Sequence, residues 1–180
     1  MGLDIFMERF DVFLKIAVVH HHPVPIAYVN VDLQARLQES FMIFFNAGTF
    51  LRELGRSGVD VVLHGHKHYT GFSRITYDMP DFVRHEMSVL AAGSATHHKP
   101  SDPLGNEFNV IRVYDDDTVD AEQWYFSAAA GRKEQSRSYV LVNNDDVRGR
   151  RHQQLIRHTG MTCREVTKRF TLTRNGYSAV

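Results

Sequence analysis

Two histidine clusters, each placed directly after a short run of β-branched residues, constrain the fold of this chain more than any other feature. The run Lys15–Val19 leads into His20–His22, and the run Val59–Leu63 leads into His64–His68. Short β-branched runs bounded by turn residues predict buried strands. Between them, Glu39–Leu54 has apolar residues at helical spacing. The order strand, helix, strand predicts a βαβ unit with a parallel pair of strands, and therefore an α/β fold.

The two clusters are expected to meet, because functional groups of βαβ units collect at the carboxyl ends of the strands. In an extended segment His66 and His68 point to the same side, and Gly65 before them allows a tight turn. His20 could complete the group, and neutral imidazole binds zinc, iron and manganese well. The residues alone leave three alternatives open: a mononuclear zinc site, half of a two-metal site that also needs carboxylates, and solvated histidines without a metal.

The rest of the chain reads mainly as strands. The alternation after His68 predicts four of them, with Asp115–Asp117 as a hairpin turn between the last two. Their ranges are Phe72–Tyr77, Met87–Ala92, Asn106–Tyr114 and Val119–Phe126. We therefore divide the chain into residues 1–14, a short helix or truncated start; residues 15–127, the body; and residues 128–180, a polar basic tail or the start of a further domain.

Composition excludes several classes of protein. No apolar run approaches the roughly 20 residues that a membrane span needs, and the start of the chain does not resemble a signal peptide, so we expect a cytoplasmic protein. The single cysteine, Cys163, excludes an internal disulfide. The formal net charge is zero, with acidic residues in excess before residue 132 and basic residues after it. A tail that is solvated or contacts the acidic body explains this better than nucleic-acid binding does.

The two motifs, His20-His21-His22-Pro23 after one strand and Gly65-His66-Lys67-His68 after the next, resemble the last two motifs of the calcineurin-like metallophosphoesterases. The branch with bacterial cyclic-nucleotide phosphodiesterases is the most similar, and the resemblance covers about residues 15–126. It implies the C-terminal half of a four-layer α/β/β/α sandwich. It also implies a hydrolase of phosphomonoesters or phosphodiesters that uses two divalent metal ions, manganese, iron or zinc, on a phosphate-ester substrate.

The resemblance assigns roles to individual histidines. His20 and His66 match ligands of the second metal, and His68 matches a ligand of the first. His21 and His64 lie next to these ligands, and His97 lies in a later loop. These last three are candidates for contact with the substrate, with a structural or solvent-exposed role as the alternative.

Three earlier motifs of the family are absent from the sequence: Asp-x-His, Gly-Asp-x-x-Asp and Gly-Asn-His followed by Glu or Asp. In the family they supply the carboxylate ligands, so no catalytic residue is assigned here. We expect an N-terminally truncated form that binds one metal or none. The alternatives are an inactive metal-binding or partner-binding remnant, and a half-site that a second chain completes. An exposed sheet edge is then expected to mediate self-association or binding of that partner.

Overall fold

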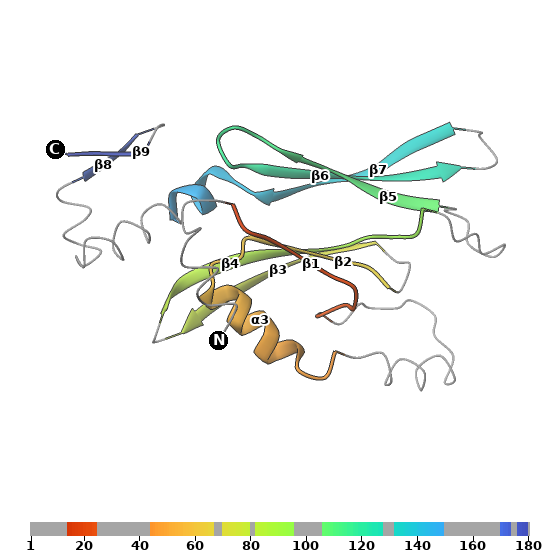
Figure 1. Ribbon diagram of the computed structural model, residues 1–180. Helices are drawn as coiled ribbons and strands as arrows, with labels where there is room; N and C mark the ends of the chain where they lie inside the picture. The colour runs from red at the N-terminus through yellow and green to blue at the C-terminus, as the bar shows by residue number, and fades with distance from the viewer. Residues whose placement is uncertain are drawn as a thin grey trace.

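The computed structural model describes residues 14–24, 44–66, 70–79, 82–95, 106–127, 132–149, 170–173 and 176–179. Within these ranges the chain is a mixed α/β fold, built mostly of strands with few helices (Figure 1). The elements are β1 (Ile16–Val19), α3 (Ala47–Arg56), β2 (Val61–His64), β3 (Gly71–Met79), β4 (Phe82–Ala91), β5 (Asn106–Val113), β6 (Val119–Ser127), β7 (Arg132–Val142), β8 (Phe170–Thr173) and β9 (Gly176–Ala179).

The first sheet has the strand order β1-β2-β4-β3. β1 pairs in parallel with β2, and β2 pairs in parallel with β4, whereas β3 and β4 form an antiparallel hairpin. Because α3 lies between β1 and β2 in the chain, the predicted βαβ unit with a parallel pair is confirmed. β1 is at the edge of this sheet.

A buried carboxylate fixes the register of the parallel pair. The backbone N–H of Lys15 donates to Oδ2 of Asp60 at 3.0 Å, and the N–H of Asp60 donates to the carbonyl oxygen of Lys15 at 2.9 Å. Asp60 is only 4% exposed. These two bonds hold the starts of β1 and β2 together, so that Ile16 lies opposite Val61.

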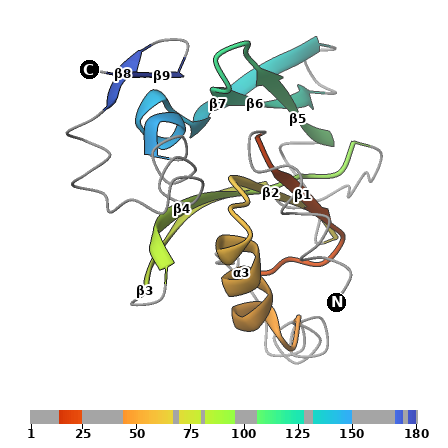
Figure 2. The same cartoon turned by 60° about the vertical axis from the view of Figure 1, so that its left-hand side comes forward.

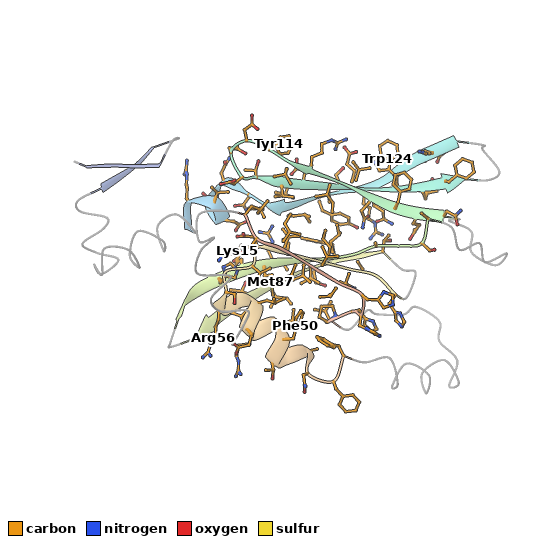
Figure 3. The ribbon with its side chains drawn as sticks, in the orientation of Figure 1. Lys15, Phe50, Arg56, Met87, Tyr114 and Trp124 are labelled. Atoms are coloured by element: carbon orange, nitrogen blue, oxygen red, sulfur yellow. The ribbon has the colours of Figure 1, made fainter. Side chains whose placement is uncertain are left out.

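Three layers result, with the first sheet in the middle (Figures 1 and 2). Side chains of one strand alternate between its two faces. Val62 therefore packs with Leu51 and Leu54 of α3, and Val61 packs toward the second sheet with Val119 and Leu141. Figure 3 shows Met87 and Phe50 in the layer between the first sheet and α3.

The second sheet has the order β5-β6-β7, with both pairs antiparallel. The predicted hairpin turn joins β5 to β6, where Asp116 Oδ1 accepts hydrogen bonds from the backbone and hydroxyl of Thr118. β7 lies beyond residue 127, where sequence analysis ends the body. Yet Leu141 and Val142 of β7 are buried, as is Val147 of a short helix over residues 144–149. The predicted boundary therefore falls inside this sheet, because β7 completes the core.

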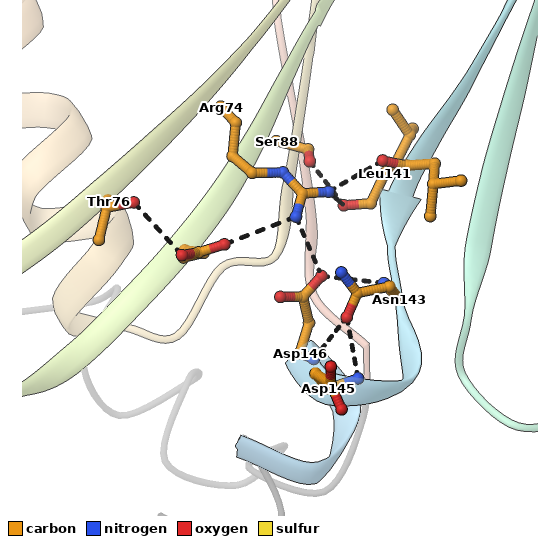
Figure 4. Close-up of polar contacts among 9 residues, drawn as sticks. Arg74, Thr76, Ser88, Leu141, Asn143, Asp145 and Asp146 are labelled. Carbon is orange, nitrogen blue, oxygen red and sulfur yellow. Dashed lines mark hydrogen bonds and ion pairs between the residues drawn. The ribbon is translucent and has the colours of Figure 1, made fainter.

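Arg74 of β3 links the two sheets (Figure 4). Its guanidinium donates to the carbonyl oxygen of Val140 at 2.9 Å and lies 3.6 Å from the carboxylate of Asp146. Asn143 caps the short helix, since its Oδ1 accepts the N–H groups of residues 145 and 146. Ser88 of β4 donates to the carbonyl oxygen of Leu141. The end of β7 is thus fixed to the first sheet by polar bonds as well as by apolar contact.

The helix differs from its prediction. Sequence analysis starts it at Glu39, and residues 39–43 lie outside the described ranges. Within those ranges α3 begins at Ala47, after a turn over residues 44–46 in which the N–H of Ala47 donates to the carbonyl oxygen of Phe44. The aromatic run misled the prediction, because the side chain of Phe45 is 94% exposed and does not contribute to a buried helix face. Gly58, with φ +70°, ends the segment after α3.

Three further expectations concern the start of the chain, membrane spans and the number of layers. The predicted helix at the start of the chain lies outside them, apart from residue 14. None of the described helices is long and apolar enough to cross a membrane. Of the four expected layers, α3 and the two sheets account for three, and no described helix packs on the outer face of the second sheet, where Figure 3 places Trp124.

We predict that Asp60→Ala lowers the free energy of unfolding by about 2 kcal/mol, because it leaves the partly buried N–H of Lys15 without its carboxylate acceptor. Chemical denaturation monitored by circular dichroism measures this change. Asp115→Ala, in the exposed turn, is the matched control and should change stability by less than about 0.5 kcal/mol. Equal stability of the two variants would show that Asp60 does not hold the register.

Candidate metal centre

The register of β1 and β2 brings the two histidine clusters to the same end of the first sheet. Val19, the last residue of β1, lies opposite His64, the last residue of β2. The parallel pairing continues for one more bond, because the N–H of Gly65 donates to the carbonyl oxygen of His20 at 3.3 Å. The two clusters therefore start within one residue of each other along the sheet, as the βαβ prediction requires.

The backbone turns sharply at His66. Its φ of +79° lies in the left-handed region, which costs a non-glycine residue roughly 1–2 kcal/mol. Sequence analysis assigned the tight turn to Gly65, but the unusual backbone angle belongs to His66. The turn directs the ring of His66 back to His20, and Nδ1 of His66 lies 2.8 Å from Nε2 of His20. A strained residue at a strand end is a feature that functional sites often show.

A third imidazole lies beside this pair. The ring centroid of His21 is 4.7 Å from that of His66 and 5.0 Å from that of His20. His20 and His21 are exposed, and His66 is partly exposed. The structure thus brings together two of the three expected metal ligands and one of the three expected substrate contacts, on a surface open to solvent.

His64 lies apart from this group. It is 4% exposed, and its ring is 6.4 Å from that of the buried His22. Burial, with a smaller contribution from His22, lowers the pKa of His64 to about 4, although the nearby backbone of Gly65 opposes the shift. Its Nδ1 is buried and makes no hydrogen bond of normal geometry within the described part of the chain. This position suits a structural histidine better than direct contact with a substrate.

The remaining two candidates lie outside the described residues. These are His68, expected as a metal ligand, and His97, expected near the substrate.

The described candidate ligands, His20 and His66, fit a metal in part. Two ring nitrogens on one tetrahedral zinc, at bond lengths of about 2.0–2.1 Å, lie roughly 3.3 Å apart. The 2.8 Å separation of His20 and His66 is a hydrogen bond, so a cation between them would need the nitrogens to move apart by about half an ångström. No group of three His, Cys, Asp or Glu side chains that could hold a metal is found in the described ranges. A complete site therefore needs at least one donor from outside them.

Sequence analysis missed a polar cluster at the same end of the sheet. Glu107 and Gln123 are 7% and 6% exposed, and both lie between the two sheets. Nε2 of Gln123 donates to Oγ1 of Thr70 at 2.5 Å, just before the start of β3. The alternation along β6 could have revealed it. Gln123 follows the buried Val119 and Ala121 at every second residue, so it lies on the buried face, where an apolar side chain is expected.

Comparison with known proteins adds no assignment, since no protein-family model matches the chain and no curated protein matches its sequence.

We predict that His66→Gly is more stable than His66→Ala by about 1 kcal/mol. Both variants lose the bond to His20, but only glycine adopts a φ of +79° without strain. Denaturant midpoints of the two variants, compared at a common slope, measure the difference. If alanine is as stable as glycine at this position, His66 is not held in the left-handed region.

We also predict a pH dependence of stability that depends on His64. Its pKa in the folded chain, about 4, lies below the unfolded value of 6.5, so the unfolded chain binds the proton first. The contribution is complete above pH 6.5 and is lost as the pH falls to about 4, by at most roughly 3 kcal/mol. In metal-free protein, His64→Gln should flatten the curve of unfolding free energy against pH in this window. Parallel curves for the variant and the wild type would contradict the assignment.

Proposed function

We propose that this chain forms the histidine part of a metal-dependent phosphoesterase, a hydrolase of phosphomonoesters or phosphodiesters. The observation that carries the proposal is the contact between Nε2 of His20 and Nδ1 of His66, at the adjoining ends of two parallel strands. These are two of the three residues that match metal ligands of the calcineurin-like metallophosphoesterases. His68, the third, follows His66 by two residues.

The order of layers supports the same proposal. A helix, a sheet with parallel strands and a second, antiparallel sheet stack in sequence, as three of the four layers of that family's sandwich do. The histidines lie at the carboxyl ends of the parallel strands, where α/β proteins place their ligands. Common topology does not by itself define a function, so the chemistry of the site has to decide.

The chain's own residues have separable roles in this proposal. His20, His66 and His68 would hold a divalent cation, which when bound supplies Lewis acidity and charge neutralisation for a phosphate ester. His21 is exposed beside both described ligands, so it is positioned to contact an oxygen of the substrate. His64 would have a structural role, as a buried neutral ring at the end of β2.

A second candidate function is a metal-binding or partner-binding protein without turnover. The observation that favours it is that the described ranges contain no carboxylate that completes the histidine group. Three neutral imidazoles do not offset two divalent cations, so a two-metal site needs carboxylates from elsewhere. The edge strand β1 could bind a chain that supplies them, because Val18 is 75% exposed and Ile16 is 38% exposed there.

We predict that the purified chain binds zinc or manganese, and that His20→Ala and His66→Gly each weaken binding at least tenfold by removing a ligand. Elemental analysis after metal loading and desalting gives the stoichiometry, and titration gives the affinity. His85→Gln is the matched control, since His85 bonds to the carbonyl oxygen of Val59 at the other end of the sheet and should bind no metal.

Hydrolysis then separates the two functions. Metal-dependent cleavage of bis(p-nitrophenyl) phosphate that is lost in His66→Gly and kept in His85→Gln supports the phosphoesterase. Metal binding without cleavage supports the second candidate. If the metal binds equally well to His66→Gly, His20→Ala and wild type, the phosphoesterase and the metal-binding function are both excluded for this site.

A further inference from the structure

We propose that Ile16 and Val18 form a binding surface for the organic group of the phosphate ester, so that the site prefers esters with an apolar or aromatic group over esters with a polar one. The inference rests on the proposed function, because it names the substrate class of the same site. Val18 comes two residues before His20 in the chain and is 75% exposed, and Ile16 is 38% exposed.

Val18 and His20 lie on the same face of the first sheet. Exposure alternates along the chain here, because Ile16, Val18 and His20 are exposed whereas Ala17 and Val19 are half-buried. Ala17 and Val19 pack with the apolar cluster beside α3, and the pairing with β2 extends to His20. Since neighbouring side chains of a strand point to opposite faces, the three exposed side chains point away from α3, at intervals of about 6.6 Å.

The second sheet covers this face over β2 but leaves it open over β1. Ile16 lies opposite Val61 of β2, and Val18 lies opposite Leu63. Val61 and Leu63 pack in the core between the two sheets, whereas Ile16 and Val18, on the edge strand, are exposed. Ile16 and Val18 therefore form an apolar strip beside Leu63, and the strip ends at His20.

The surroundings of the apolar strip favour an apolar ligand. No charged side chain comes between Lys15 and His20 in the sequence, so this strand offers no partner to a charged organic group. The rings of His21 and His66 lie beside that of His20, and imidazoles donate hydrogen bonds and bind cations. An ester whose phosphate lies at these rings can bury its organic group against the strip, and burial of apolar surface favours binding. Exposed apolar residues are common, and these two are distinguished by their position on the face of His20.

The size of the apolar strip favours a small ligand over a protein chain. β1 has four residues, so a strand that pairs with it forms only a few hydrogen bonds. Stable interfaces between proteins bury about 1,200 Å² or more, an area that two side chains do not supply. Discrimination between small ligands needs much less, since the burial of about one methylene group already changes selectivity measurably. The histidines would then fix the phosphate, and the strip would select the organic group.

The experiment uses variants of the full, metal-loaded chain and two diesters with the same leaving group, phenyl p-nitrophenyl phosphate and methyl p-nitrophenyl phosphate. Val18→Ser removes the apolar contact, and Val18→Ile retains it. Val113→Ser is the matched control, since Val113 is a 55% exposed valine at the end of β5 in the second sheet. The measured quantity is the ratio of kcat/KM for the phenyl ester to that for the methyl ester. The intrinsic reactivities of the two esters cancel when this ratio is compared between variants.

A second readout does not need turnover. Isothermal titration of the zinc-loaded protein gives the dissociation constants of phenylphosphonate and methylphosphonate. We expect Val18→Ser to lower the preference for the phenyl ligand about threefold or more in both readouts, because it removes an apolar contact. Val18→Ile and Val113→Ser should keep the preference of the wild type. The affinity for zinc, measured by competition with a chelator, should be the same in all variants, because valine is not a metal ligand.

The outcomes separate this inference from the proposed function. The inference is overturned if Val18→Ser keeps the wild-type preference, if Val113→Ser loses it to the same extent, or if neither phosphonate binds. Sedimentation equilibrium tests the other occupant: a wild-type dimer that Val18→Ser dissociates would show that a second copy covers the strip, which also overturns the inference. If the phosphonates bind with the expected preference but neither ester is cleaved, the hydrolase is excluded and the inference about the ligand class stands.

Discussion

The pairing of Lys15 with Asp60 is the constraint on which the rest of the first sheet depends. β1 has only four residues, and parallel strands so short have little to fix their alignment. A buried carboxylate that accepts one particular N–H allows a single register, because a shift by one residue would turn the apolar side chains of β1 to the opposite face. The meeting of the two histidine clusters is therefore set at the other end of the strands, five residues before His20 and six before His66.

Buried polar groups lie at both ends of the first sheet, with an apolar centre between them. Asp60 and Ser88 mark one end, and Thr70 with Gln123 marks the other. Apolar packing alone would hold the sheets together but would let them slide, since dispersion and burial have little directional preference. Hydrogen bonds at the two ends add direction. At the first end Asp60 aligns β1 on β2, and Ser88 joins the first sheet to β7. At the other end Gln123 joins the second sheet to Thr70.

Sequence analysis predicted the features that follow from the hydrophobic pattern, and it missed the features that depend on tertiary contacts. The β-branched runs predicted β1 and β2, and their order predicted the parallel pair. β7 was not predicted, because residues 132–138 are polar and charged and resemble a solvated tail in sequence, whereas Leu141 further along the strand is in the core. The left-handed angle of His66 also escaped, because the adjacent Gly65 was the residue that steric reasoning favoured. The metal and phosphate chemistry still rests on the histidine motifs, since His68 and His97 lie outside the described ranges.

The mixture of parallel and antiparallel pairing has a consequence for how the chain folds. The antiparallel pairs are β3 with β4, β5 with β6, and β6 with β7, and each joins segments that are close in sequence, so closing the loop between them costs little entropy. β1 and β2 are separated by 41 residues between Val19 and Val61 and pay a larger entropic cost to meet. Contacts between distant segments form late in typical folding reactions. The two histidine clusters would then come together only after most of the sheet exists, so in a newly made chain the exposed imidazoles would meet near the end of folding, with the hairpins already in place.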